Sequence, residues 1–390
     1  MAKKRILIFS TAYFPFVGGA EVAVKEITDR LRGQYEFDLI TAKLDKNFLA
    51  VEKIGAVTIH RIGTGKILRD KLFLPFLGAK YAFKLNKEKN YICFWGIMAT
   101  FGSGAGYICN IFQKLFLGKK TPMVLTLQEG DSENYLQYKW AGLISLSWRL
   151  ALWQTDYLTA LSNFLLNRAK RYGFNGKSFL VPNGVDVQFF SKPIPERTRK
   201  ILENKLAKKP EDIFLVAVSR LVHKNATDDI IRSLTLLPKN VNLLVIGKGE
   251  EGPTLQKLAT RLGVSDRVKF LGFISHKDLP TYLSICDIFV RPSRSEGFGN
   301  SFIEAMAFGL PVIATPVGGI PDFLDDKETG IFCSPDNPKS LAEAVNLLLN
   351  DHSLALKIVQ KAKERVVQRY DWDIVARQME TCIFSPLSSV

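Results

Sequence analysis

Residues 288–314 read IFVRPSRSEGFGNSFIEAMAFGLPVIA, and this stretch decides the fold. It begins with a continuous apolar run and passes through a loop rich in serine and glycine. Apolar residues at helical spacing follow, and a second apolar run, 311–314, ends the stretch. Apolar runs without alternation are typical of parallel strands that are covered on both faces. A strand, a helix and a second strand in this order predict one unit of a doubly wound α/β sheet.

The same alternation of short apolar runs and helix-spaced segments extends over the whole chain. Further runs fall at 5–10, 37–41, 57–61, 91–95, 123–127, 157–160, 178–181, 214–219, 242–246, 268–273 and 330–332. Two prolines, Pro193 and Pro195, separate the two groups of runs, which is typical of a linker. The sequence therefore predicts two Rossmann-like domains with a cleft between them, at 1–192 and 193–370. A terminal helix, 371–390, is expected to cross back to the first domain.

Composition places the chain among ordinary globular proteins, because 47% of its 390 residues are hydrophobic and 23% are charged. Much of the net charge of +15 lies in the first 190 residues, which hold 26 Lys and Arg against 14 Asp and Glu, or +12. A basic surface attracts polyanions, but no nucleic-acid recognition module accompanies it, so nucleic acid is not an expected partner. The five cysteines and four histidines lack metal-ligand spacing. They predict no metal site, and the thiols suit a reducing cytoplasm.

One basic segment, 66–89, has the character of a membrane-surface element. It carries seven Lys or Arg against Asp70 and Glu88, interleaved with Leu and Phe. This pattern favours contact with anionic lipid, although an acceptor-side helix with a solvated face explains it equally. The uncharged stretch 90–113 is long enough to span a bilayer, but its glycines favour a strand, a loop and a helix. We expect a cytoplasmic protein, with the inner face of the membrane as the place of any peripheral contact.

Two glutamates of the opening stretch are candidates for binding a sugar. Glu296 lies in the loop and Glu304 in the following helix, and carboxylates there can accept hydrogen bonds from the vicinal hydroxyls of a ribose or hexose. Glu304 also completes a capping box with Ser301, and taken alone that structural role is the stronger interpretation. Glu296 has no obvious cation partner nearby in the sequence, which favours a ligand role.

Cations and glycines that follow two other strands are candidates for binding phosphate. Arg220 and Lys224 come after the run 214–219, at the edge where open α/β sheets bind ligands, and could clamp a diphosphate. Two solvated loop cations are the plain alternative. Gly18 and Gly19 begin a helix, where backbone N–H groups favour phosphate, but a tight turn without a ligand explains them equally.

Several segments, in order, resemble the retaining glycosyltransferases of family four, also called group one, which have the GT-B fold. The segments at 15–21, 181–186, 219–222 and 271–274 are similar to those of the family. The most specific match is the E-x7-E signature from Glu296 to Glu304, which continues to residue 314. The resemblance covers most of the chain. It implies metal-independent transfer of a hexose-type sugar from a nucleotide-diphosphate sugar to a glycan or lipid-linked acceptor, as in cell envelope glycan synthesis.

The resemblance also implies roles for individual residues. The catalytic residues would be Glu296, Arg220 and Lys224. The donor would be bound by Gly18, Gly19, Phe273, Ile274, Phe298, Gly299, Asn300 and Glu304. The sugar or acceptor side would include Gln128 and Glu129. No cofactor or metal is implied beyond the nucleotide sugar, with UDP slightly favoured over GDP.

The sequence departs from the family pattern at three places, one of which is Asp322, where glutamate is commoner. Asn225 and Ala226 stand where the family usually has Lys and then Gly, so Lys224 lies one position early. Gln128 and Glu129 replace the usual His-Asp pair, so a histidine contact to the donor sugar is absent. Two alternatives stay open. One is a sugar-nucleotide epimerase of the same fold, and the other is a non-catalytic protein that binds a nucleotide sugar, for which the departures at Gln128 and Asn225 leave room.

Overall fold

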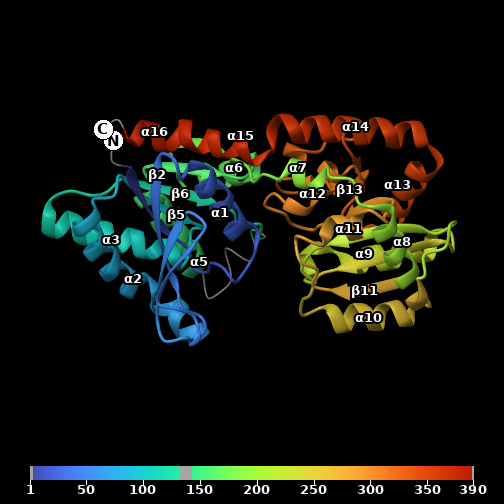
Figure 1. The fold of residues 1–390 in the computed structure, drawn as a ribbon, viewed down its shortest axis with the longest axis horizontal. Coiled ribbons are helices and arrows are strands. Elements are labelled where there is room, and N and C mark those ends of the chain that lie inside the picture. The colour runs from blue at the N-terminus through green and yellow to red at the C-terminus, as the bar shows by residue number, and fades with distance from the viewer. Residues whose placement is uncertain (1–2, 132, 134–142, 389–390) are drawn as a thin grey trace. The chain divides into compact units, whose positions relative to one another are not determined.

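The computed structural model describes residues 3–131, 133 and 143–388. Contacts divide the chain into two units, Met1–Asn183 with Trp372–Val390, and Gly184–Asp371. Each unit is an α/β domain built on one sheet (Figure 1). The division falls before helix α7 (Val187–Phe190), because α7 contacts α12 (Asn300–Phe308) of the second unit. The sequence instead places the boundary after α7, at the two prolines of the linker.

The sheet of the first unit has the strand order β3-β4-β2-β1-β5-β6-β7-β8 within the described residues. Its strands are β1 (Lys4–Phe9), β2 (Tyr35–Ala42), β3 (Val51–Ile54), β4 (Val57–Ile62), β5 (Cys93–Ile97), β6 (Met123–Leu127), β7 (Tyr157–Ala160) and β8 (Lys177–Leu180). Neighbouring strands are parallel, except that β3 is antiparallel to β4. The sequence did not predict β3, because this edge strand alternates exposed and half-buried residues and has no apolar run.

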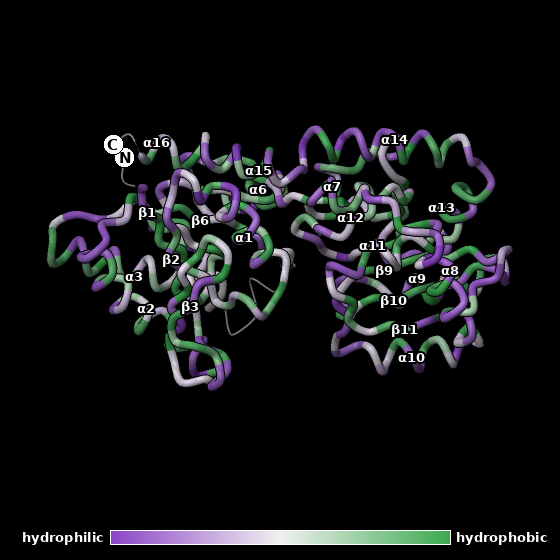
Figure 2. Tube along the Cα trace, in the orientation of Figure 1, coloured by the Kyte–Doolittle hydropathy of each residue, from purple (hydrophilic) through white to green (hydrophobic). Residues whose placement is uncertain are grey.

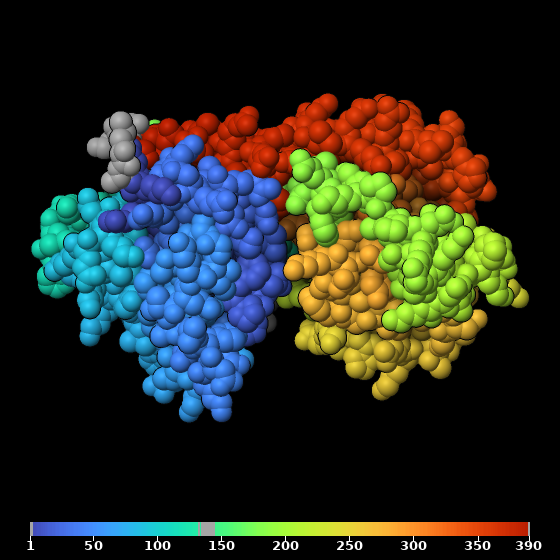
Figure 3. All heavy atoms as spheres, in the orientation of Figure 1, coloured from blue at the N-terminus to red at the C-terminus, as the bar shows by residue number. Residues whose placement is uncertain are grey.

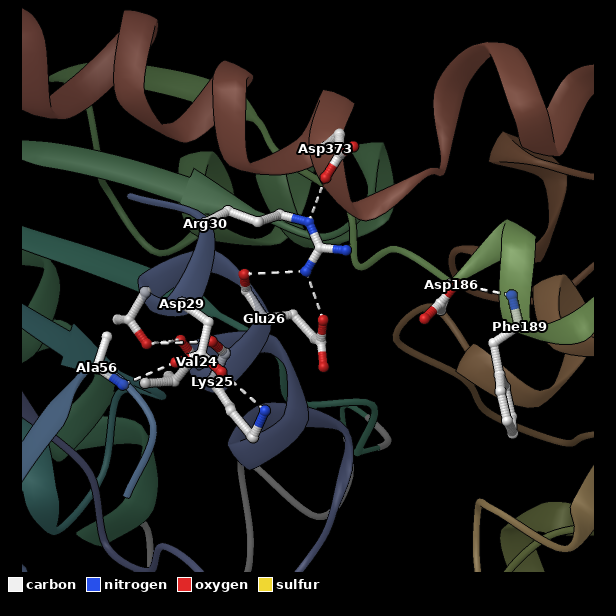
Figure 4. Close-up of polar contacts among 10 residues, drawn as sticks. Val24, Lys25, Glu26, Asp29, Arg30, Ala56, Asp186, Phe189 and Asp373 are labelled. Atoms are coloured by element: carbon white, nitrogen blue, oxygen red, sulfur yellow. Dashed lines mark hydrogen bonds and ion pairs between the residues drawn. The ribbon is translucent and has the colours of Figure 1, made fainter. Parts of the chain in front are cut away.

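The helices of the first unit include two segments far apart in the sequence. They are α1 (Gly19–Leu31), α2 (Ile67–Lys89), α3 (Gly102–Leu117), α5 (Leu143–Gln154), α6 (Asn163–Arg171), α15 (Trp372–Met379), the π-helix Glu380–Phe384 and α16 (Ser385–Ser388). Ile27 of α1 and Val375 of α15 belong to one buried cluster. Arg30 also donates a 2.5 Å hydrogen bond to Asp373 and pairs with Glu26 (Figure 4). Apolar burial and this ion pair therefore hold α15 on α1.

The sheet of the second unit is parallel, in the order β11-β10-β9-β12-β13-β14. Its strands are β9 (Ile213–Val218), β10 (Val241–Ile246), β11 (Val268–Gly272), β12 (Ile288–Arg291), β13 (Val312–Ala314) and β14 (Ile331–Phe332). The remaining α-helices are α8 (Glu196–Lys205), α9 (Thr227–Ser233), α10 (Gly252–Arg261), α11 (Leu279–Leu283), α13 (Pro338–Asn350) and α14 (His352–Arg369). Short 3-10 helices span His223–Asn225, Leu234–Leu236, Ser265–Arg267 and Ile320–Asp322.

Hydropathy and capping explain why these segments of the second unit form their elements. Strands such as β10 and β11 are mainly hydrophobic, whereas α14 alternates between hydrophilic and hydrophobic positions (Figure 2). This difference is expected when both faces of a sheet are covered and each helix keeps one face in water. Asp186 accepts a hydrogen bond from the Phe189 N–H at the start of α7 (Figure 4), and Asp351 does the same for Leu354 at the start of α14. Side chains thus satisfy N–H groups that the first turn leaves without a partner.

Within the described part of the chain, no helix has both the length and the apolar character needed to cross a bilayer. The uncharged stretch 90–113 contains strand β5 and most of helix α3, as the sequence predicts. The sequence pattern predicts this helix at 106–117, and it begins four residues earlier, at Gly102.

Candidate functional site

The second unit brings two of the predicted loops to one edge of its sheet. Strands β9 and β12 are parallel neighbours, with Ile288 opposite Leu215 and Phe289 opposite Val216. Their carboxyl ends therefore face the same way, and the loops that follow them carry Arg220 and Glu296. This is the edge at which open α/β sheets bind ligands.

Glu296 is buried against a cation, contrary to the sequence-based expectation that it lacks one. Its Oε2 forms an ion pair with the Nη2 of Arg291, and only about a tenth of either side chain is exposed. Its Oε1 accepts a 3.0 Å hydrogen bond from the Gly297 N–H. The expectation was wrong because Arg291 ends an apolar strand, where a buried guanidinium is uncommon. A fixed carboxylate in this position keeps lone pairs for further hydrogen bonds from a ligand.

A chain of hydrogen bonds connects the Glu296 loop with the Arg220 loop. Nη2 of Arg291 donates a 2.9 Å hydrogen bond to Oδ1 of Asn225, whose amide donates a 2.6 Å bond to the Arg220 carbonyl oxygen. The Arg220 side chain itself is exposed. The backbone N–H of Arg294 also donates to the Lys224 carbonyl oxygen at 2.8 Å. The two predicted clusters thus belong to one connected substructure.

Arg294 adds a second bridge between these loops. It donates to the His223 carbonyl oxygen at 2.8 Å and forms ion pairs with Asp228, Asp229 and Asp336. Burial, and then the neighbouring Asp228, raise the pKa of Asp229 to about 6. Arg294 makes no contact with Glu296 among the described interactions, so its role here is structural.

Glu304 does not form the capping box that the sequence suggests. Helix α12 begins at Asn300 with Gly299 as its N-cap, so Glu304 lies too far into the helix to reach back to the cap. Its Oε1 lies 3.2 Å from Nε2 of His276, and its side chain is 13% exposed. The His276 ring stacks on Phe189 with centroids 6.0 Å apart. Glu304 is therefore held by a side chain from another loop.

Glycines allow the loop around Glu296 to close tightly. Gly299 has a φ of 89°, which suits glycine at the start of α12. A Cβ on Gly318 would lie 1.8 Å from the Glu296 carbonyl oxygen. The neighbouring Gly319 N–H donates to that same oxygen at 3.1 Å. The segment that follows β13 therefore fixes the backbone of Glu296.

The other donor-side candidates of the second unit differ in exposure. The Phe298 ring is buried against Phe323 and Tyr370, so its expected contribution is limited to the backbone. Phe273 is 67% exposed after β11, and Ile274 is half-buried. Ala226 has a φ of 52°, the left-handed conformation that the glycine usual at this position adopts at lower cost.

The candidates of the first unit are involved in contacts of their own. The Gly18 N–H donates to Oε2 of Glu21 at 2.8 Å, so a phosphate at this helix start would compete with that carboxylate. Burial raises the pKa of the Glu21 carboxyl. Glu129 is 8% exposed and accepts hydrogen bonds from the Ala99 and Gln128 N–H groups. Burial raises its pKa as well, and these contacts tie the loop after β5 to the loop after β6.

Sequence reasoning missed Arg291 and His276 as parts of the site. The signal for Arg291 was present, because a charged residue at the end of a buried strand must find a partner. His276 gave no comparable signal, since its contact with Glu304 joins residues 28 positions apart. Across the residues that the structure describes, no three His, Cys, Asp or Glu side chains gather in a way that could hold a metal ion.

Comparisons with known proteins now identify the family. A profile described as "Glycosyl transferases group 1" matches residues 198–365, and one described as "Glycosyltransferase Family 4" matches residues 17–189. The chain belongs to the group 1 glycosyltransferases. Both profiles match in the expected order, and residues 198–365 include the Arg220 and Glu296 loops.

Named relatives of this family member are glycosyltransferases with different substrates. A GDP-mannose-dependent alpha-(1-6)-phosphatidylinositol monomannoside mannosyltransferase from Mycobacterium tuberculosis is 30% identical over 58% of this chain and 60% of that protein. The N-acetyl-alpha-D-glucosaminyl L-malate synthase of Bacillus anthracis is 27% identical over 72% of each chain. The match to the mannosyltransferase thus spans about 60% of that relative's length.

Solved structures show that the fold is GT-B. Sucrose-phosphate synthase from Thermosynechococcus elongatus matches with a TM-score of 0.85 and 22% identity over the whole of both chains. Anabaena HepE, solved with UDP and glucose, matches with a TM-score of 0.76 and 21% identity over 99% of this chain and 100% of that one. At this identity the likeness shows the fold and leaves the substrate open.

Proposed function

We propose that this protein is a retaining glycosyltransferase. It would move a hexose-type sugar from a nucleotide-diphosphate sugar to a glycan or lipid-linked acceptor. The observation that carries the proposal is the hydrogen-bonded connection from the Arg220 loop to Glu296 through Asn225 and Arg291. It supports a single donor site at the carboxyl edge of β9 and β12. Membership of the family supports the reaction class.

The proposed chemistry depends on positioned charge. A bond forms between the acceptor oxygen and the anomeric carbon as the bond from that carbon to the diphosphate breaks. Arg220 and Lys224 stabilise the negative charge that develops on the leaving diphosphate. Its released oxygen takes the acceptor proton on the same face, which retains the anomeric configuration. Glu296 holds the hydroxyls of the donor sugar, and Glu304, braced by His276, holds the ribose diol.

The base of the donor is the first feature to test. We favour UDP over GDP, which is in keeping with HepE solved with UDP and glucose, although the mycobacterial relative is named for GDP-mannose. UDP-sugars are expected to raise the unfolding temperature more than GDP-sugars at equal concentration. A donor at a hundred times its Kd stabilises the folded state by about 2.7 kcal/mol. Thermal shift with a panel of UDP- and GDP-sugars measures this order directly.

Product analysis distinguishes a transferase from an epimerase and from a non-catalytic protein. It uses the sugar nucleotide that raises the unfolding temperature most. Acceptor-dependent release of the nucleoside diphosphate supports a transferase. Turnover of the donor without an acceptor supports an epimerase, and tight binding without turnover supports a non-catalytic protein. A GDP-sugar that stabilises more than every UDP-sugar contradicts the choice of base.

We also propose that residues 66–89 contact an anionic membrane. Most of these residues form α2, and several of its large apolar side chains are exposed: Ile67, Leu68, Leu72, Phe73, Phe76 and Leu77. Asp70 is buried and accepts hydrogen bonds from the Thr64 and Gly65 N–H groups. Its charge is therefore directed inward, and the charged side chains left on the outer face of α2 are mainly basic.

Helix α3 carries further exposed apolar side chains. α2 and α3 pack together and lie on the part of the first unit drawn from light blue to cyan in Figure 3. Leu115 and Phe116, near the end of α3, are 73% and 74% exposed. A cavity of about 400 Å³ nearby is lined by Lys87, Lys119 and Lys120 among others. Apolar side chains beside lysines match a bilayer surface that carries anionic headgroups.

Replacing Phe76 and Leu115 together by Glu should weaken binding to phosphatidylglycerol vesicles by more than tenfold. The double variant loses two exposed apolar anchors and adds two negative charges to a basic surface. Co-sedimentation at low and high salt measures the effect. Leu356→Glu is the matched control, because Leu356 is 72% exposed on α14 of the second unit. If the wild-type protein does not co-sediment with these vesicles at low salt, the proposed membrane contact is ruled out.

A further inference from the structure

The strongest unassigned feature of the site is the buried guanidinium of Arg291. Arg291 ends strand β12 and is 8% exposed. Its guanidinium lies over the Phe302 ring, 5.1 Å from the centroid, and Nη1 donates a 3.1 Å hydrogen bond to the Ser301 hydroxyl. With the contacts to Glu296 and Asn225, one side chain joins strand β12, its loop, helix α12 and the loop after β9.

Asn225 is a second partner of this cation. Asn225 stands where the family usually has a lysine, and its side chain is 3% exposed. Nη2 of Arg291 reaches both Oδ1 of Asn225 and the carboxylate of Glu296. The positive charge thus lies beside position 225, although it comes from another strand. An asparagine can accept this hydrogen bond while donating to the Arg220 carbonyl oxygen, which a lysine cannot do.

We propose that Arg291 is the positioning residue of the donor site. In this chain it supplies, from the end of β12, the buried charge that a lysine at position 225 would supply from the loop after β9. Its planar fork orients the Glu296 carboxylate and fixes the Arg220 loop at the same time. The residue does not itself touch the donor. This inference rests on the proposed function for its catalytic consequence, but the positioning is a property of the folded protein alone.

The test moves the charge back to position 225. Crystal structures and donor kinetics are compared for wild type, Arg291→Met, Asn225→Lys and the double variant. In Arg291→Met the Glu296 carboxylate should leave its wild-type position, and kcat/KM should fall about a hundredfold, as expected for a misplaced catalytic group. Asn225→Lys alone should also lose activity, because two cations then face each other. In the double variant the Glu296 carboxylate should return to its wild-type position, and kcat/KM should be at least ten times that of Arg291→Met.

Recovery in the double variant is the outcome that a merely structural role does not give. Arg294→Met is the matched control, since it removes ion pairs from the same loop without touching Glu296. It should leave the Glu296 carboxylate in place. If Arg291→Met does not fold, Arg291→Lys keeps the charge without the fork, and its structure should show Glu296 held but the bond to Ser301 lost.

Two outcomes would contradict the positioning role of Arg291. A Glu296 carboxylate that does not move in Arg291→Met overturns the proposal. A double variant also overturns it if its kcat/KM is no higher than the value expected when the effects of the two single changes are multiplied. If wild type turns over no sugar nucleotide, the proposed function fails. The crystal structures still decide whether Arg291 positions Glu296.

Discussion

Glu296→Gln should lower kcat/KM for transfer by about a thousandfold or more, equivalent to roughly 4 kcal/mol of transition-state stabilisation. The amide keeps the shape of the side chain and one oxygen acceptor for Arg291. It loses the charge and replaces the second oxygen by a donor, so the hydroxyls of the donor sugar and the Gly297 N–H both lose an acceptor. Initial rates with the donor that binds best measure the effect. Rates within threefold of wild type contradict the role of Glu296.

The choice of glutamine matters because Glu296 is half of a buried ion pair. Glutamine removes the charge but keeps an oxygen that accepts from the Arg291 guanidinium. Glu296→Ala would remove the acceptor as well, and leaving a buried charge without its partner typically costs about 3–5 kcal/mol of folding stability. Loss of activity in the alanine variant would then report unfolding as well as chemistry. Glu343→Gln makes the same chemical change at an exposed position of α13 and should leave both rate and stability unchanged.

Gly318→Ala should impair both folding and transfer. A Cβ there would lie 1.8 Å from the carbonyl oxygen of Glu296, and the φ of 57° disfavours any side chain. Overlap and left-handed backbone together cost about 2–4 kcal/mol. The loop must move to relieve the overlap, which displaces Glu296 and should lower kcat/KM about a hundredfold. Denaturant unfolding and initial rates measure the two effects.

Gly263→Ala separates the overlap from the backbone effect. Gly263 has a similar φ of 67°, but a Cβ there would meet no atom of a more distant residue within 4 Å. The change should therefore cost about 1 kcal/mol of folding stability and leave transfer intact. If both alanine variants lose the same stability and neither loses transfer, the close approach of Gly318 to Glu296 is not important.

The chain order of elements could be predicted from the sequence with few errors. Unbroken apolar runs mark the central strands of both sheets, because a strand covered on both faces needs apolar residues throughout. The edge strand β3 was not predicted, because its side chains alternate between exposed and half-buried positions and form no apolar run. The spacing from Glu296 to Glu304 also identified the family, which the profile matches confirmed.

The partners of the site residues could not be predicted in the same way. Glu304 looked like half of a capping box because Ser301 precedes it by three positions, yet α12 begins at Asn300 and Glu304 meets His276. Arg291 and Asn225 are 66 positions apart and meet only because β9 and β12 are neighbours in the sheet. Contacts of this kind depend on strand order, which the local pattern of residues does not specify.

The amino-acid sequence by itself determined the two α/β domains, the family and the candidate residues of the donor site. These follow from local periodicity and from a signature confined to one strand, loop and helix. Only the tertiary structure decided which charges are paired and which loops are joined. The physical reason is that a buried charge is stabilised by whichever partner the folded chain brings within hydrogen-bonding distance, however far away that partner lies in the sequence.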